Sequence, residues 1–229
     1  MTDGKALRAA LKIVFWSMIL LLAVLAGGVI ARFLASAIDW LAGSLMVLWV
    51  LFTAFTFYFF RDPSPVIPNI PNAIVAPAHG KVDLIDETNE AEFVCGPCRR
   101  ISIFLSVFDV HVQRAPVTGR IGYMRHTAGK FLSATRCDCA LHNENTLIGI
   151  EPAGYSVKIA VRQIAGLIAR RILTWVEPGA KVPRGDRIGL IQYGSRVEIF
   201  LPMDVKIHAR LGDRVRGGET VIASFESSS

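Results

Sequence analysis

The stretch Gly179–Gly185, GAKVPRG, recurs as Gly212–Gly218, GDRVRGG, so that both copies follow the pattern Gly-x-x-Val-x-x-Gly. Each copy is followed by a run that contains Val or Ile. Glycine allows a positive φ at tight turns, and the central valine suits a position that faces inward. We therefore expect two similar strand-and-turn units in the C-terminal part of the chain.

The sequence around this repeat is typical of a mainly β protein. From Ala73 onward, short runs rich in Val, Ile and Phe alternate with Gly, Pro and Asp. The repeat resembles an element of the barrel-sandwich fold of biotinyl and lipoyl domains, which gives no function by itself. We expect a barrel-sandwich-like domain over residues 73–229. Its expected strands are Ile74–Ala76, Lys81–Asp86, Arg100–Leu105, His111–Gln113, Gly119–Arg125, Asn145–Glu151, Ser156–Ile164, Arg187–Ile191, Arg196–Leu201 and Glu219–Ser224.

Two apolar runs precede this domain. Ile13–Ile30 and Leu41–Phe60 contain no charged residue, and each is close to the roughly 20 residues that a helix needs to cross a bilayer. We expect residues 1–61 to form a membrane anchor of two apolar helices, a transmembrane helical hairpin. A cleaved signal peptide and two helices lying in one leaflet are the alternatives. Four prolines within residues 62–72 indicate an extended linker.

The charge distribution indicates the side of the membrane. Lys5, Arg8 and Lys12 precede the first run and Arg61 follows the second, which predicts that both ends of a hairpin lie in the cytoplasm. The net charge of +6 suits a domain beside an anionic inner membrane. The chain has no basic motif interleaved with aromatic residues, so we expect no nucleic-acid partner.

A Gly-Ser bond lies between two apolar runs, in the sequence IQYGSRVE over Ile191–Glu198. A Gly-Ser pair alone is an ordinary turn. Between two predicted strands, however, the bond between Gly194 and Ser195 is also a candidate for self-cleavage, since glycine offers no side chain to obstruct attack on its carbonyl group.

Several separated segments resemble one family, the short bacterial form of phosphatidylserine decarboxylase. The resemblance spans most of the chain, with the segments in the family's order and behind a membrane prefix. The segments that carry it are Tyr58–Pro63 (YFFRDP), Ala76–Val82 (APAHGKV), Phe104–Pro116 (FLSVFDVHVQRAP), Gln163–Arg171 (QIAGLIARR) and Tyr193–Val197 (YGSRV).

This resemblance implies a proenzyme that cuts itself between Gly194 and Ser195. It implies a large chain, 1–194, and a small chain, 195–229, whose first residue becomes a pyruvoyl group. That ketone is an electron sink, and it would allow phosphatidylserine in the membrane to lose carbon dioxide and become phosphatidylethanolamine. A homo-oligomer remains open.

Self-cleavage and decarboxylation both need a group that takes up or donates a proton, for which histidine is suited at neutral pH. His111 lies in the family-like segment Asp109-x-His111 and is our first candidate. The alternative is a histidine that only forms a hydrogen bond in the core.

His79 departs from the pattern that the resemblance implies, because aspartate is expected in the Pro-Ala-x-Gly turn. His79 could take the proton of Ser195, or it could pair with Asp109 or Asp83. Self-processing could also be slow or lost. Arg114 is a candidate for holding the lipid phosphate or the substrate carboxylate, with a surface ion pair as the alternative.

Four cysteines form two close pairs, Cys95 with Cys98 and Cys137 with Cys139. Two such pairs can complete a structural zinc site, although a Cys-x-Cys pair is less typical of zinc than a second Cys-x-x-Cys pair. Thiols without a metal are the preferred interpretation, because we do not associate the family with structural zinc. The expected cytoplasmic location disfavours structural disulfides and leaves free thiols or a redox pair.

Three other functions stay open at this point. A decarboxylase of a related serine-headed lipid would use the same chemistry. A homologue that never matures is suggested by His79. A membrane-tethered barrel-sandwich adaptor or carrier would need an exposed lysine at a hairpin tip or a long coiled-coil insertion, and the sequence offers no convincing case of either.

Overall fold

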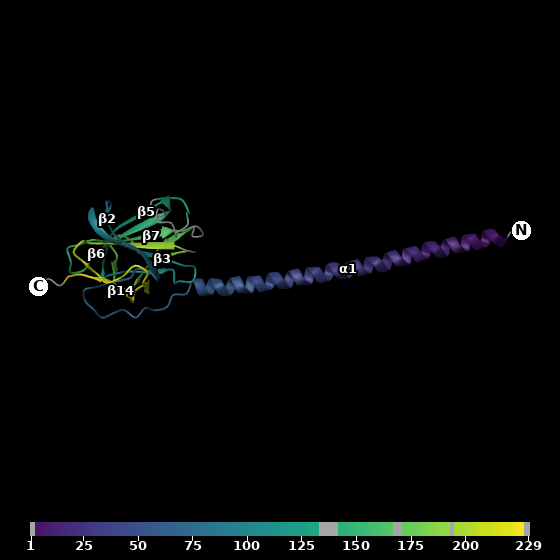
Figure 1. Ribbon diagram of the computed structural model, residues 1–229, viewed down its shortest axis with the longest axis horizontal. Coiled ribbons are helices and arrows are strands. Elements are labelled where there is room, and N and C mark those ends of the chain that lie inside the picture. The colour runs from purple at the N-terminus through teal and green to yellow at the C-terminus, as the bar shows by residue number, and fades with distance from the viewer. Residues whose placement is uncertain (1–2, 133–141, 167–170, 193–194, 227–229) are drawn as a thin grey trace. The chain divides into compact units, whose positions relative to one another are not determined.

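The computed structural model describes residues 3–132, 142–166, 171–192 and 195–226 (Figure 1). The chain divides into two compact units, Met1–Thr56 and Phe57–Ser229. The first consists of helix, and the second contains the strands together with the last turn of the helix.

Helix α1 runs without interruption over Asp3–Phe59. The predicted hairpin is therefore wrong: the structure has one continuous helix in its place. The reason lies between the two apolar runs, where residues 31–40 contain neither glycine nor proline and several good helix formers. Arg32 and Asp39 are charged, but charge alone does not end a helix.

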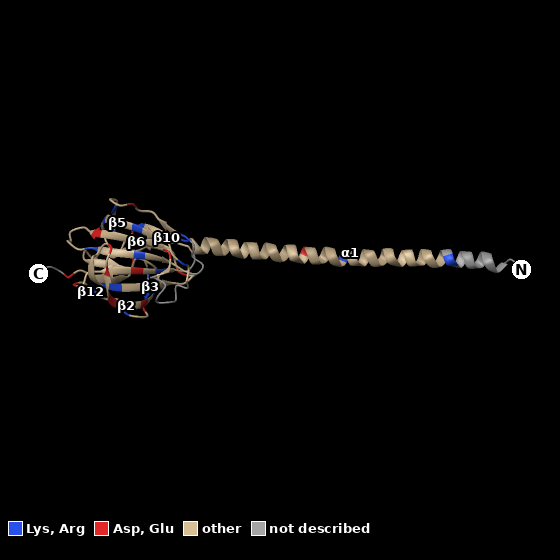
Figure 2. Cartoon of the chain, turned by 90° about the horizontal axis from the view of Figure 1, so that it is seen from above, with Lys and Arg blue, Asp and Glu red and all other residues tan. Residues whose placement is uncertain are grey.

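The segment Val14–Phe59 of α1 is long and apolar enough to cross a membrane. Figure 2 shows it as a nearly unbroken run of uncharged residues, whereas charged residues are spread over the strands. The chain is thus expected to associate with a membrane through α1.

The second unit is mainly β, as predicted. An eight-stranded sheet has the order β13-β2-β3-β11-β7-β6-β5-β9, and two three-stranded sheets have the orders β1-β14-β12 and β4-β10-β8. The strands are β1 (Ala73–Val75), β2 (Gly80–Glu90), β3 (Gly96–Leu105), β4 (Val112–Arg114), β5 (Gly119–Thr127), β6 (Asn145–Pro152), β7 (Ile159–Ala165), β8 (Ile172–Thr174), β9 (Lys181–Val182), β10 (Arg187–Ile191), β11 (Ser195–Leu201), β12 (Lys206–Ile207), β13 (Arg214–Val215) and β14 (Val221–Ser224).

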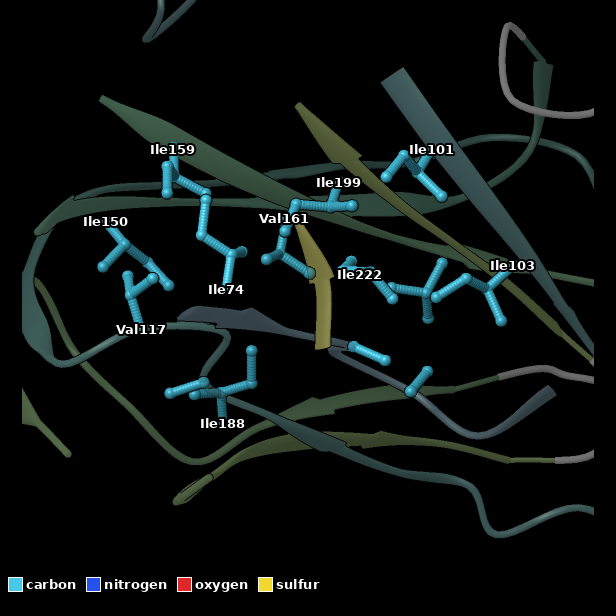
Figure 3. Close-up of a cluster of buried hydrophobic side chains, with 14 of the residues drawn as sticks. Ile74, Ile101, Ile103, Val117, Ile150, Ile159, Val161, Ile188, Ile199 and Ile222 are labelled. Atoms are coloured by element: carbon cyan, nitrogen blue, oxygen red, sulfur yellow. The ribbon is translucent and has the colours of Figure 1, made fainter. Parts of the chain in front are cut away.

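The large sheet curls around a core that all three sheets share. Buried Ile and Val side chains from the large sheet meet Ile74 of β1, Ile188 of β10 and Ile222 of β14 (Figure 3). Burial of these branched side chains is the main source of stability for such a unit, at about 25 cal/mol per Å² of apolar surface.

The two copies of the glycine repeat lie at opposite edges of the large sheet. Their valines belong to the edge strands β9 and β13 and are buried, and all four outer glycines have φ between +80° and +95°. The prediction of two strand-and-turn units is confirmed.

The second glycine of each copy also faces the proline-rich linker. A Cβ atom on Gly185 would lie 2.7 Å from the Ile67 side chain, and one on Gly218 would lie 3.0 Å from Pro65. Arg184 donates hydrogen bonds to the carbonyl oxygens of Pro68, Ile70 and Ala73 at 2.7 to 2.9 Å. The linker therefore packs on the β unit.

Candidate active site

Ser195 is the first residue of β11, and this strand lies between β3 and β7. It pairs with Leu105, the last residue of β3, and with Ala165, the last residue of β7. The side chain is fully buried, and its Oγ has no hydrogen-bond partner among the residues that the structure describes. A buried hydroxyl without a partner is costly and points to a functional role. Gly194, the other residue of the predicted cleavage bond, lies outside the described residues.

His111 lies in the connection from β3 to β4 and is fully buried. Its Nδ1 lies 2.9 Å from the carbonyl oxygen of Asp109. A carbonyl can only accept, so Nδ1 carries the proton of the neutral ring and Nε2 carries the lone pair. This is the tautomer that a proton acceptor needs.

Burial lowers the pKa of His111 from 6.5 to about 4, because the interior disfavours the charged imidazolium. The hydrogen bond to Asp109 and the charge of this carboxylate oppose the effect, while Arg61 adds to it. At neutral pH His111 is therefore an uncharged base.

The carboxylate of Asp109 forms hydrogen bonds within its own turn. Its Oδ2 accepts hydrogen bonds from the backbone N–H and the hydroxyl of Ser106, both at 2.8 Å. Asp109 thus shapes the turn before His111, and its contact with the ring comes from the backbone carbonyl.

His79 immediately precedes β2 and is half-buried. The backbone N–H of Gly217 donates a hydrogen bond to its Nδ1 at 3.2 Å, so the proton of the neutral ring sits on Nε2. Burial lowers the pKa of His79, although Glu219 and Asp109 act in the opposite direction. In this arrangement His79 has a proton to donate from Nε2, and its lone pair is already engaged.

Asp83, one of the two acids considered as partners of His79, is engaged elsewhere. Its carboxylate accepts two hydrogen bonds from the buried Arg196, at 2.6 and 3.0 Å. Arg196 also donates to the hydroxyl of Ser102 at 2.7 Å. The residue directly after Ser195 is therefore fixed to both β2 and β3.

Arg114 forms contacts within the β unit. It is almost fully buried, and its guanidinium pairs with Asp62 and donates to the carbonyl oxygens of Pro63 and Gly185. These contacts hold the start of the linker, and the proposed role of Arg114 toward a lipid phosphate or a substrate carboxylate stays a prediction.

Three polar residues hold the surroundings of Ser195. Gln163 of β7 donates to Gln113 at 2.8 Å, and Gln113 donates to the carbonyl oxygen of His111 at 2.7 Å. Asn143 donates to the carbonyl oxygen of Ala165 at 2.7 Å. Only Asn143 had a signal, as part of a polar segment between predicted strands, because a buried glutamine pair has no sequence signature.

The cysteines are described in part. Cys95 is exposed and Cys98 is buried, both as free thiols, and burial raises the pKa of Cys98. Cys137 and Cys139 lie outside the described residues. Within residues 3–132, 142–166, 171–192 and 195–226, no group of three or more His, Cys, Asp and Glu could hold a metal ion. The zinc hypothesis therefore stays untested.

Comparison with known proteins identifies the family. The family model of phosphatidylserine decarboxylase matches residues 52–223. A phosphatidylserine decarboxylase proenzyme of Desulfotalea psychrophila is 46% identical over 79% of this chain and 84% of its own length. Proenzymes of the same name from Symbiobacterium thermophilum and Carboxydothermus hydrogenoformans are each 42% identical, over 82% and 84% of this chain and 86% and 89% of their own. The chain belongs to the phosphatidylserine decarboxylase family.

Proposed function

We propose that this chain decarboxylates phosphatidylserine to phosphatidylethanolamine and carbon dioxide at a membrane surface, after cutting itself between Gly194 and Ser195. The single observation that carries the proposal is the buried hydroxyl of Ser195 at the start of a central strand, without a hydrogen-bond partner among the described residues, in a chain of this family. The name proenzyme, given to the relatives, supports a processing step.

Self-cleavage requires a nucleophile and a base. The Ser195 oxygen attacks the carbonyl carbon of Gly194, and the peptide C–N bond breaks as the Ser195 nitrogen takes up a proton, which leaves an ester. Loss of the Ser195 α-proton then expels the carboxylate of residue 194 and leaves dehydroalanine. Addition of water and loss of ammonia give the pyruvoyl end. His111 is the proposed base, because its neutral ring carries the lone pair on Nε2.

A pyruvoyl group at Ser195 would supply the electron sink for loss of the substrate carboxylate. The chain's own residues fit this group: its precursor is buried at the meeting of three strands, where solvent is excluded. His111 would accept or return protons there. His79, with its proton on Nε2, is the second candidate for donating one.

The two chains are proposed to stay together after the cut. In the small chain, 195–229, β11 pairs with β3 and β7, β14 pairs with β1, and β13 pairs with β2. Each of these three strands therefore has at least one partner within residues 1–194. Separation would expose the shared core, so cleavage leaves the fold intact.

The proposed organisation follows from these elements. Residues 1–61 anchor the chain to the membrane, residues 62–72 form the linker, and residues 73–229 form the catalytic domain. We place the catalytic domain on the cytoplasmic side of the inner membrane, because Lys5, Arg8 and Lys12 precede the apolar segment and Arg61 follows it, and a helix that lies along the inner leaflet would keep both basic ends on that side. Protease protection in intact spheroplasts tests this side: cleavage of the domain from outside would contradict it.

Conversion of lipid tests the function. The purified full-length chain is incubated with phosphatidylserine in mixed micelles, and phosphatidylethanolamine is measured by mass spectrometry. Ser195→Ala is expected to abolish product formation and to leave an intact chain. An active Ser195→Ala variant would refute the assigned precursor, and turnover confined to another serine-headed lipid would favour the alternative substrate.

A further inference from the structure

The last residue of α1 lies inside the candidate active site. Phe59 is fully buried, and its ring packs on the imidazole of His111 with 4.2 Å between ring centroids and 33° between ring planes. Phe59 also ends the apolar segment Val14–Phe59 that could cross a membrane. The end of the membrane helix and the proposed base are therefore in direct contact.

The residues around Phe59 hold this contact in place. Arg61 donates to the carbonyl oxygen of Phe108 at 2.7 Å and to that of Tyr58 at 2.7 Å. Its guanidinium lies 3.9 Å from the centroid of the Tyr58 ring. Asp62 pairs with Arg114 and Arg187. Residues 58–62, which we call the clasp, thus bind the chain on both sides of His111.

We propose that Phe59 is a positioning residue for the reaction, whose ring fixes the imidazole of His111 and shields one of its faces from water. This inference rests on the proposed function in one respect, the role of His111 as the base. It extends that function by making the end of the membrane anchor part of the active site.

Electrostatics agree with this geometry. Burial is the largest cause that lowers the pKa of His111, and an uncharged phenyl ring acts through burial alone. Among the described residues, Asp109 from its own turn and Arg61 from the clasp are charged groups that act on the imidazole. Removing the Phe59 ring would admit water and move the pKa of His111 upward, toward 6.5.

Histidine titration by NMR tests the proposal without requiring activity. The full-length Ser195→Ala chain is labelled at its histidines, and the His111 signal is assigned with His111→Gln. We expect a midpoint near 4 in this parent and an upward shift of about one pH unit or more in Phe59→Ala. Phe59→Trp keeps a ring and should retain the low midpoint of His111. Phe59→Leu keeps part of the burial of His111, so its midpoint should lie between those of the parent and Phe59→Ala.

Two controls separate positioning from general destabilisation. Phe93 is a buried aromatic residue of a separate hydrophobic cluster, so Phe93→Ala should cost stability and leave the His111 midpoint unchanged. Phe57→Ala removes an exposed ring from the last turn of the same helix and should also leave it unchanged. An unchanged midpoint in Phe59→Ala, or an equal shift in Phe93→Ala, would overturn the proposal.

The rate of self-cleavage supplies the second measurement. In the chain with Ser195 intact, the lower pH limit of cleavage should move upward in Phe59→Ala and return in Phe59→Trp. If no chain cleaves at any pH, the proposed function fails, while the titration still decides the role of Phe59.

Discussion

His111 and His79, the two histidines of the candidate site, use their Nδ1 atoms in opposite ways. His111 donates from Nδ1 to a carbonyl oxygen, whereas the Nδ1 of His79 accepts from a backbone N–H. The first ring therefore carries its lone pair on Nε2, and the second carries its proton there. One arrangement suits a base and the other a proton donor, so backbone contacts alone give two identical side chains different chemistry.

The largest expected effect comes from removing the base. His111→Gln should slow self-cleavage at pH 7 by at least about 100-fold, since general-base catalysis typically contributes that much or more. Cleavage is followed by denaturing electrophoresis of freshly translated chain. His208→Gln is the matched control, because His208 is exposed and bonds to Ser224. Normal cleavage in His111→Gln would show that another group is the base, and the contrast between His111 and His79 would no longer explain the chemistry.

Stability against pH should reveal the neutral imidazole. The folded chain keeps His111 uncharged down to about pH 4, while the unfolded chain takes up this proton near pH 6.5. The unfolded state binds more protons in between, so stability falls as the pH drops through this window, by of the order of 3 kcal/mol. Denaturant unfolding of Ser195→Ala at pH 7 and pH 4.5 measures this.

The same experiment on His111→Gln in the Ser195→Ala chain should lose most of that pH dependence. His79, whose pKa is also lowered by burial, should account for a smaller remainder in the same direction. An equal pH dependence with and without His111 would show that the imidazole is not buried in its neutral form.

Asp83→Asn tests whether the Asp83 carboxylate acts through Arg196 or through His79. We expect self-cleavage to slow about tenfold, because loss of a charge-assisted pair on Arg196 loosens the residue after Ser195. Asp86→Asn, which weakens a similar pair with Arg100, is the control and should have a smaller effect. In a double-mutant cycle Asp83→Asn and His79→Gln should be additive. Strong coupling would instead make Asp83 the partner of His79.

The smallest expected effect belongs to His79. His79→Gln should slow cleavage less than tenfold, because glutamine can still donate a hydrogen bond but cannot transfer a proton. His79→Asp tests the residue that the family pattern led us to expect. Faster self-cleavage in His79→Asp would support an orienting role for that acid, and a loss as large as that of His111→Gln would show that His79 is equally essential.

Much of the fold follows from local patterns in the sequence. Glycines that need positive φ mark the turns of both repeats, and alternating Val and Ile mark the strands between them, so the main strands were predicted to within a few residues. The predicted hairpin is wrong because two apolar runs do not show whether the helix ends between them. The residues between these runs include no helix breaker, so one helix continues through both. The short strands β8, β9, β12 and β13 were missed, since strands of two or three residues depend on their partners.

Residues of the candidate site could be predicted from the sequence only where they lie in a family-like motif. Ser195 and His111 came from family-like segments, and both are buried at one end of the large sheet and its neighbouring turn. The contacts of Arg114 with Asp62 and two carbonyl oxygens could not be predicted, because they join segments far apart in the sequence. The contact between Phe59 and His111 joins residues far apart in sequence, and only the fold brings them together.

The central claim is that Ser195 cuts its own peptide bond and becomes the ketone on which the lipid chemistry depends. Intact-mass analysis of the purified full-length chain tests it most directly. We predict two polypeptides, 1–194 and 195–229, with the smaller one lighter by one ammonia than a peptide that begins with serine, and heavier by two hydrogens after borohydride treatment. Catalytically active material that shows one uncut chain, or a small fragment with an ordinary serine amine, would contradict the account.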